Sequence, residues 1–368
     1  MIYIVVDNLQ VGGIQRLALD ESYFLRNISI PSCILVLNNK EKNNCMLSID
    51  QNYLEKYPLN IRYLSESRLK GIMSLTKMIR KSSEKNLFVS HTPSGSFMIR
   101  LASLLAIKKV TILLWIHQVI TLSRSAQAKK RIFYAIFANH IYFGAKQFYI
   151  EWENYVSTCK LFKFLLRNRT EFSRIGVYLH RVLWKGHKLF LDISSSDKNI
   201  VFASRNTPWK QIKTFVRISE YLTRAEYSSI LMSYENSGFS EKDFENQKVA
   251  INYCPAGLRN IPNLVHLYPT NYGPGVANPL PIGLNVMEFL ALGIPSLISQ
   301  SDNLTYPELM DSELIEICDW NNLEDVELKV NNLTQLPYSE RVKAATALHS
   351  NISIDSHIEI ILRHFRSI

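Results

Sequence analysis

An arginine and a lysine follow an apolar run in the second half of the chain. In VFASRNTPWKQIKTF (201–215), an expected strand leads to Arg205, and Lys210 stands five residues later at the expected start of a helix. Cationic side chains that meet near a helix N-terminus can neutralise a diphosphate, including the charge that grows on a leaving group. Because such a pair is commonplace after a strand, it indicates phosphate chemistry only together with other features.

Two glycines follow the first expected strand. The chain reads NLQVGGIQRLALDES from 8 to 22, with Gly12 and Gly13 ahead of a helix expected over about 13–27. Glycines there let backbone amides approach a ligand, and the helix N-terminus favours an anion. The segment matches neither the dinucleotide fingerprint Gly-x-Gly-x-x-Gly nor a P-loop, and the same glycines could serve only the turn.

A loop, a helix and a strand are expected over NPLPIGLNVMEFLALGIPSLIS (278–299). Gly283 leads into a helix over about 284–292, Gly293 suits its C-terminal end, and Glu288 is expected in its first turn. A carboxylate beside a backbone-lined loop can accept hydrogen bonds from ribose or sugar hydroxyls. The alternative is an exposed carboxylate at a helix start.

Two histidines end expected strands, where they would face a ligand at one edge of a parallel sheet. His117 closes VTILLWIH (110–117), and His91 follows LFVS (87–90). A histidine at a strand end is more often packed or solvated than functional, and we rank His91 below His117. No Asp-x-Asp motif is present, and the cysteines form no Cys-x-x-Cys pair, so the sequence favours neither a metal site nor a disulfide framework.

Taken together and in this order, the segments resemble the pattern of glycosyltransferase family 4, whose members have the GT-B fold. That family shows a Gly-Gly loop after the first strand, a Gly-Arg-x-x-x-x-Lys-Gly segment that opens the second domain, and a Glu-x7-Glu stretch followed by Ala-x-Gly-x-Pro-Val. The counterparts here are Gly12 with Gly13, Ser204-Arg205 with Lys210-Gln211, and Glu288 with FLALGIPSLIS (289–299). The resemblance covers nearly the whole chain.

The resemblance implies a nucleotide diphosphate sugar as the donor, UDP- or GDP-linked, transfer with retention, and no obligatory metal. The implied catalytic residues are Arg205, Lys210 and His117. The implied donor-binding residues are Gly12, Gly13, Gly283, Leu284 and Glu288, with Glu288 at the ribose. The chain departs from the pattern at Leu280, which replaces the first carboxylate, and at Ser204 and Gln211, which replace two glycines.

Apolar runs alternate with amphipathic helices along both halves of the chain, which is typical of parallel sheets covered on both faces. The strands are expected at 2–6, 33–38, 87–90, 110–117, 200–204, 229–233, 264–268 and 295–299. The polar stretch DISSSDKN (192–199) separates the halves. We therefore expect an α/β protein of the GT-B class, with two doubly wound Rossmann-like domains that face a central cleft. The expected boundaries are 1–190 for the acceptor or membrane domain, 199–350 for the nucleotide-sugar domain, and 351–368 for a C-terminal helix that packs back on the first domain.

Positive charge is concentrated in one stretch of the chain. Between Ser67 and Lys188, 22 lysines and arginines stand against four acids, a balance of +18, so the rest of the chain carries −8 of the total of +10. Basic clusters at Lys77–Lys81 and Lys129–Arg131 lie beside apolar and aromatic residues, which suits anionic lipid headgroups. No nucleic-acid-binding signature accompanies them. No apolar run approaches the roughly 20 residues of a membrane span.

The sequence thus predicts a cytoplasmic retaining glycosyltransferase, peripheral on the inner face of a membrane. The acceptor would be a hydroxyl of a lipid-linked, lipopolysaccharide or capsule-type glycan. Two alternatives stay open: a nucleotide-sugar epimerase of the same fold, and a non-catalytic scaffold that binds sugar or membrane.

Overall fold

Two parallel sheets, one in each of two structural units, organise the chain. A computed structural model describes residues 1–10, 12–37, 51–65, 67–82, 86–117, 126–157, 160–166, 168–186, 198–204, 211–232, 248–250, 255–259, 261, 263–270, 283–299 and 306–368. The first unit comprises Met1–Leu47, Leu54–Tyr178 and Ile354–Ile368, and the second comprises Ser48–Tyr53 and Leu179–Ser353.

The sheet of the first unit has the order β3-β2-β1-β4-β5-β6-β7 in the described residues, and each neighbouring pair is parallel. Its strands are β1 (Ile2–Val6), β2 (Ser32–Val36), β3 (Ile61–Tyr63), β4 (Leu87–Ser90), β5 (Thr111–Ile116), β6 (His140–Phe143) and β7 (Thr170–Phe172). All residues of β1 and β4 are buried, as expected for apolar strands covered on both faces.

The sheet of the second unit has the order β10-β9-β8-β11-β12-β13 in the described residues and is also parallel. Its strands are β8 (Lys198–Ala203), β9 (Tyr227–Met232), β10 (Lys248–Ala250), β11 (Leu264–Tyr268), β12 (Ser296–Ser299) and β13 (Ile315–Cys318). Numbered within each unit, both sheets contain the strand order 3-2-1-4-5-6 of the doubly wound fold. The direction of winding reverses between β1 and β4 and between β8 and β11, and ligands of such folds bind at the carboxyl ends of the strands there.

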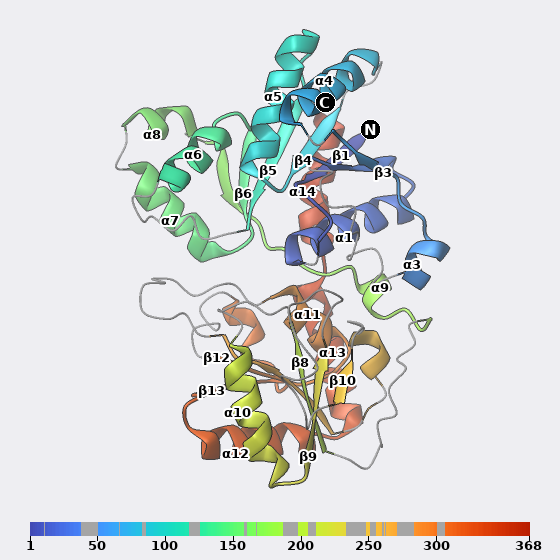
Figure 1. The fold of residues 1–368 in the computed structure, drawn as a ribbon, viewed down its shortest axis with the longest axis vertical. Helices are drawn as coiled ribbons and strands as arrows, with labels where there is room; N and C mark the ends of the chain where they lie inside the picture. The colour runs from blue at the N-terminus through green and yellow to red at the C-terminus, as the bar shows by residue number, and fades with distance from the viewer. Residues whose placement is uncertain are drawn as a thin grey trace. The chain divides into compact units, whose positions relative to one another are not determined.

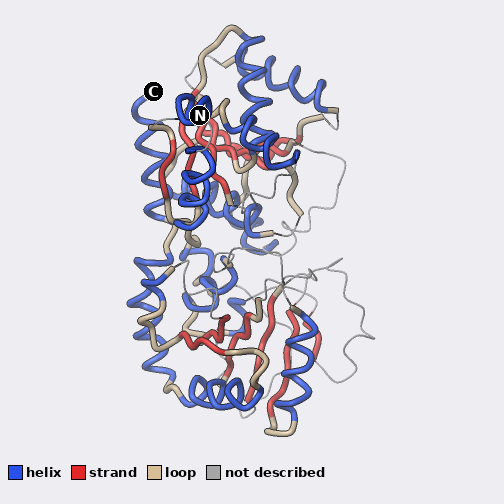
Figure 2. Tube along the Cα trace, turned by 90° about the vertical axis from the view of Figure 1, so that its left-hand side faces the viewer, coloured by secondary structure: helices blue, strands red, loops and turns tan. Residues whose placement is uncertain are grey.

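Helices connect the strands and cover the sheets (Figures 1 and 2). They are α1 (Gly13–Asn27), α3 (Gln51–Lys56), α4 (Arg68–Lys81), α5 (Pro93–Ala106), α6 (Ala126–Ala135), α7 (Lys146–Ser157), α8 (Lys160–Leu166), α9 (Leu179–Val182), α10 (Ile212–Thr223), α11 (Leu284–Ala291), α12 (Leu323–Gln335), α13 (Tyr338–Ile352) and α14 (Asp355–Ser367), with short 3-10 helices at Pro255–Leu258 and Pro307–Leu309. In the first unit α4, α5 and α6 pack side by side. The C-terminal helix α14, red in Figure 1, contacts α1, drawn in blue.

The core of the second unit lies between its sheet and the helices α10 and α12. Phe202 of β8 stacks on Phe215 of α10 with ring centroids 5.1 Å apart, and Val330 of α12 belongs to the same buried cluster. Apolar residues of α10 recur every three or four positions, so one face of the helix is buried against the strands. This packing holds the carboxyl end of β8, where the sequence places Arg205.

Candidate active site

In the first unit, three polar side chains meet where the sheet reverses its winding. Asp7 follows β1, and its Oδ1 atom accepts hydrogen bonds from the hydroxyls of Thr92 at 3.1 Å and Ser94 at 3.2 Å. Thr92 also caps α5 by accepting a hydrogen bond from the Gly95 amide at 3.0 Å. Burial raises the pKa of Asp7, and the two hydroxyl hydrogen bonds and the charge of Arg68 oppose that rise.

The Gly12–Gly13 segment forms the start of α1 at the same sheet edge. Gly12 is the N-cap residue, has an extended backbone with φ 177°, and receives no side-chain cap. The Arg16 amide donates to the Gly12 carbonyl in the first helical hydrogen bond, so the amides of the first turn have no acceptor within the helix. The backbone angle does not require glycine at position 12. The missing side chain therefore leaves room at the helix start, as an approaching anion would need, and anion binding there stays a prediction.

His117 follows β5, is half-buried, and stands at the end of a chain of polar side chains whose other members are buried in the first unit. Its Nε2 atom lies 2.9 Å from Nδ1 of His91, and Nε2 of His91 lies 2.9 Å from Oε2 of Glu21. The other carboxylate oxygen of Glu21 is hydrogen-bonded to Nε2 of His357 on α14. The structure therefore links both histidines noted in the sequence to a carboxylate on α1 and to the C-terminal helix.

Charge and burial set the protonation of this chain. Burial alone would raise the pKa of Glu21, but protonation of His91 and the hydrogen bonds from His357 and His91 oppose this effect and lower the pKa to about 2. Burial lowers the pKa of His117 well below 6.5, and protonation of His91 or His357 would lower it further. At neutral pH we therefore expect an ionised Glu21 and an uncharged His117.

In the second unit, the N-terminus of α11 lies against the carboxyl ends of β8 and β11. The Asn285 side chain donates to the Ala203 carbonyl at the end of β8 at 2.8 Å. A Cβ atom added to Gly283, the N-cap residue, would lie 2.7 Å from the Tyr268 hydroxyl at the end of β11. Any side chain at 283 would therefore displace its neighbours. Gly283 and Leu284 thus start the helix at the point where the sheet reverses its winding.

Glu288 lies in the second turn of α11, because the helix begins at Leu284. The expectation that it lies in the first turn is wrong, so its charge is not at the helix N-terminus. Its Oε1 atom accepts a hydrogen bond from Nη2 of Arg181 on α9 at 2.6 Å, and the two side chains are 3% and 5% exposed. Contact between Glu288 and a ribose stays a prediction. Arg181 could not be predicted from the sequence, because it lies in a helix of four residues and belongs to no periodic pattern.

Arg205, Lys210 and Leu280 lie outside the described residues. Gln211, which replaces a glycine of the family pattern, is described and has φ 49° and ψ 45°. Because only glycine adopts this left-handed conformation without a steric cost, a glycine would suit this position, and the glutamine of this chain occupies it at a cost.

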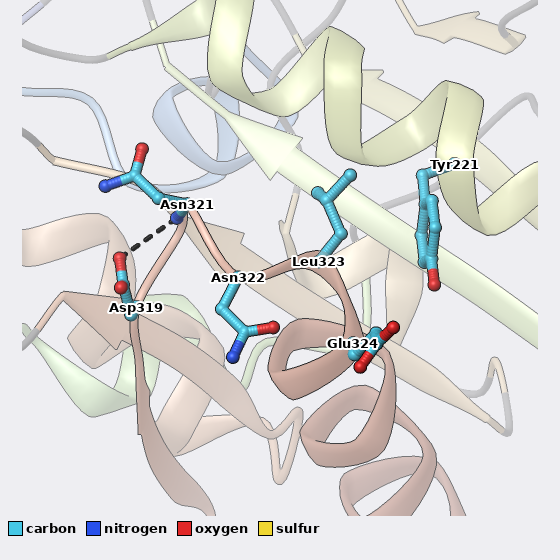
Figure 3. A pocket seen from close by; sticks show the side chains of 6 residues that line it. All are labelled: Tyr221, Asp319, Asn321, Asn322, Leu323 and Glu324. Carbon is cyan, nitrogen blue, oxygen red and sulfur yellow. Dashed lines mark hydrogen bonds between the residues drawn. The ribbon is translucent and has the colours of Figure 1, made fainter.

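A separate open hollow of about 610 Å³ lies at the edge strand β13 of the second unit. Figure 3 shows Tyr221 reaching it from α10, whereas Asp319, Asn321 and Asn322 come from the segment that joins β13 to α12, and Leu323 and Glu324 from the first turn of α12. The hollow lies away from the reversal between β8 and β11. It therefore does not coincide with the predicted nucleotide site.

Among the described residues, no group of three histidines, cysteines or acids is arranged to hold a metal ion. Within the same residues, no helix is long and apolar enough to cross a membrane.

Known proteins resemble this chain in structure rather than in sequence. No family model matches the sequence, and neither does any curated protein. The structure of Anabaena HepE in complex with UDP and glucose has a TM-score of 0.70 at 11% identity and covers 100% of this chain and 99% of that one. A glycosyltransferase from Rickettsia africae has a TM-score of 0.69 at 14% identity, with 100% and 97% covered. A trehalose-6-phosphate synthase studied for glycosyl transfer with retention has a TM-score of 0.61 at 12% identity, with 100% and 99% covered. The predicted GT-B fold is thereby confirmed.

Proposed function

We propose that this GT-B chain is a retaining glycosyltransferase similar to family 4. It transfers a sugar from a UDP- or GDP-linked donor to a hydroxyl of a lipid-linked, lipopolysaccharide or capsule-type glycan. The observation that carries the proposal is the likeness over the whole chain to structures that hold UDP with glucose and UDP-glucose. The polar residues and glycines at the carboxyl ends of the strands in each unit are of the types that this assignment requires.

In this proposal the second unit binds the nucleotide. The amides at the start of α11, from Gly283 and Leu284, and the carboxylate of Glu288 contact the nucleoside diphosphate, with Glu288 at the ribose. Arg205 and Lys210 neutralise the diphosphate as the bond to the sugar breaks, which is the step at which fixed positive charge contributes most. The acceptor hydroxyl attacks from the face of the leaving group, so no carboxylate nucleophile is required.

The first unit contributes His117 and the glycine loop to the same reaction. The uncharged imidazole of His117 can accept a hydrogen bond from a sugar hydroxyl. The amides that follow Gly12 and Gly13 can donate to a phosphate or to an acceptor oxygen. Catalysis then consists of positioning and of stabilising the leaving diphosphate, with no obligatory metal.

The test begins with binding and then measures turnover. In a thermal-shift series, either UDP and its sugars or GDP and its sugars should raise the unfolding midpoint, since a ligand at 100 times its Kd adds about 2.7 kcal/mol to the free energy of unfolding. The transferred sugar should keep its anomeric configuration by NMR. A free product formed without acceptor would favour the epimerase, and absence of nucleotide binding in calorimetry would favour the scaffold.

We further propose that the protein reaches its acceptor from the cytoplasm, as a peripheral protein on an anionic membrane surface. Of the 15 large apolar side chains exposed among the described residues, ten lie in the stretch from Ser67 to Lys188 that carries +18. Apolar side chains beside basic ones suit a lipid headgroup interface. Lys77, Arg80, Lys81, Lys130 and Arg131 of the predicted clusters are exposed, and the Lys129 side chain is not described.

The end of α5 is the strongest part of this proposed membrane surface. Ile107 is 91% exposed and has φ 57°, a conformation that costs a β-branched residue about 1–3 kcal/mol. Glycine is the usual residue at such a helix end. Leu104 and Leu105 are also exposed, and the Nζ atom of Lys108 donates to the Arg80 carbonyl at 3.0 Å. An exposed isoleucine in a costly conformation is consistent with insertion into lipid.

Sedimentation with anionic and neutral vesicles tests the membrane role. Changing Lys129, Lys130 and Arg131 to Glu should remove most of the binding to anionic vesicles, because each lysine or arginine near anionic headgroups contributes about 1 kcal/mol. Leu104→Ser with Ile107→Gly should weaken the binding that remains at high salt, where attraction between charges is screened. Leu328→Ser, an equally exposed leucine of the second unit, is the control and should bind normally. Equal binding of the wild type to both vesicle types would contradict the role.

A further inference from the structure

A continuous series of hydrogen bonds connects His117 to buried side chains of the first unit. The four residues come from four different segments and are hydrogen-bonded in the order His117, His91, Glu21, His357. We propose that Glu21, with His91 as the intermediate, is a positioning residue that fixes the tautomer and ring orientation of His117. This inference rests on the proposed function for its role in transfer, but not for its geometry.

The carboxylate determines the direction of the hydrogen bonds. With a pKa near 2, Glu21 is ionised at neutral pH and can only accept. Its two oxygens each face an Nε2 atom, so His91 and His357 must both carry a proton on Nε2. The direction of both bonds therefore follows from the charge of a single residue.

The surroundings of His357 indicate that its ring is neutral. The residue is fully buried, and its Nδ1 atom has no hydrogen-bond partner in the part of the chain that the structure describes. A proton on Nδ1 would leave a buried donor without an acceptor, which costs about 1–3 kcal/mol. We therefore assign the neutral Nε2–H form to His357, whose ring lies 4.5 Å from that of Trp115.

The same logic extends to His117 through His91. When His91 is uncharged, its proton lies on Nε2 and the lone pair on Nδ1 faces Nε2 of His117 at 2.9 Å. His117 must then donate from Nε2 and keep Nδ1 as an acceptor. Gly144 stands beside that atom, and a Cβ atom added there would lie 3.2 Å from Nδ1. The glycine thus leaves space at the nitrogen that accepts.

The other ionisable groups nearby do not disturb this assignment. Asp20, the neighbour of Glu21 on α1, is buried and accepts a hydrogen bond from the Tyr178 amide at 3.1 Å. Asp7 at the end of β1 is held by Thr92 and Ser94. Burial is the main cause of the lowered pKa of His117, protonation of His91 or His357 would lower it further, and the charge of Glu21 opposes these effects. A neutral His117 that presents one acceptor is therefore consistent with all of these groups.

The chain gives His117 a defined task in the proposed reaction. An imidazole with Nε2–H held by His91 offers Nδ1 to a hydroxyl hydrogen of the donor sugar or of the acceptor. Without the chain, the ring could rotate or change tautomer and would present a donor in place of an acceptor. Partners that orient a histidine in this way change activity by about 10-fold to 100-fold in metal sites.

The test is two-bond ¹H–¹⁵N correlation NMR of the full chain labelled with ¹⁵N-histidine, with His117→Gln for assignment. At pH 7 we expect neutral His117 with its proton on Nε2, and a protected Nε2–H signal that persists well below pH 6.5. In His91→Phe the Nε2–H signal should lose its protection. Glu21→Gln, of the same shape without the charge, provides the same readout if His91→Phe does not fold. A cationic His117, or one with its proton on Nδ1 in the wild type, would overturn the proposal.

A matched control and an activity measurement separate this inference from the proposed function. His364 lies on the same helix as His357 and is hydrogen-bonded to the Tyr142 hydroxyl at 2.7 Å, so His364→Phe should leave the His117 signals unchanged. In the transfer assay, His91→Phe should lower kcat by about 10-fold or more, with unchanged affinity for the nucleotide diphosphate. Correct NMR signals with no transfer by the wild type would refute the proposed function alone. Full activity in His91→Phe would refute the positioning role.

Discussion

The ion pair between Arg181 and Glu288 gives the sharpest prediction about the second unit. The two side chains are 5% and 3% exposed and their charged atoms lie 2.6 Å apart. Removing one partner takes this close ionic contact away from a buried charge, and breaking a buried pair in this way costs about 3–5 kcal/mol. We therefore expect both Arg181→Met and Glu288→Gln to lower the free energy of unfolding by about that amount. The structure thus changes the expectation for Glu288, whose loss should affect folding as well as ligand binding.

The double variant distinguishes the ion pair from two independent packing effects. Replacing both charged partners by neutral side chains is often close to neutral, so the double variant should lose no more stability than either single variant. The coupling energy in the mutant cycle should then be about 3–5 kcal/mol. Lys329→Met is the control, because the Lys329–Asp325 pair is about a quarter exposed and such pairs contribute about 0.3–0.5 kcal/mol.

Urea unfolding at pH 7 and calorimetry with the nucleotide diphosphate provide the two readouts. If Glu288 also binds the ribose, Glu288→Gln should weaken nucleotide binding by about 1.5–3 kcal/mol, which is roughly 10-fold to 100-fold. Arg181→Met keeps the carboxylate and should affect binding less. Losses below about 1 kcal/mol in both single variants, or additive losses in the double variant, would refute the argument from the buried pair.

Three further predictions address backbone strain, pH and the phosphate site. Gln211→Gly should raise the free energy of unfolding by about 1 kcal/mol, since φ is 49°; a lower urea midpoint would contradict this. Burial and repulsion from protonated histidines depress the pKa of His117, and contacts with histidines depress the pKa of Glu21 from 4.5 to about 2. For each group, the fold therefore has its full stability only at pH values above the unfolded pKa of that group. Stability should therefore decrease as pH falls below 6.5, with roughly 3 kcal/mol lost between pH 4.5 and 2, and the latter loss should be absent in Glu21→Gln. Arg205→Ala and Lys210→Ala should each lower turnover by about 1.5–3 kcal/mol of transition-state stabilisation with little change in thermal midpoint; normal transfer rates would remove them from the site.

The sequence by itself determined the central elements of both sheets. Buried parallel strands are continuous apolar runs, so Ile2–Val6, Leu87–Ser90 and Leu264–Tyr268 are readable from composition alone. Five strands were missed: β3, β6, β7, β10 and β13. They are only three or four residues long, and so short a segment carries no period that separates a strand from a loop. The order along the chain of the three segments that resemble the family pattern likewise indicated the fold, because such segments mark the ends of strands in a doubly wound sheet.

Only the tertiary structure decided how the site side chains are paired. Glu21 and His357 are 336 residues apart and meet because α14 packs on α1. One signal was present in the sequence: Glu21 lies four residues from both Leu17 and Leu25, on a helix face that is buried. A charge on such a face requires a partner, because an unpaired buried charge is too costly. Periodicity gives the face but not the partner, since the partner depends on contacts between segments that are distant in the chain.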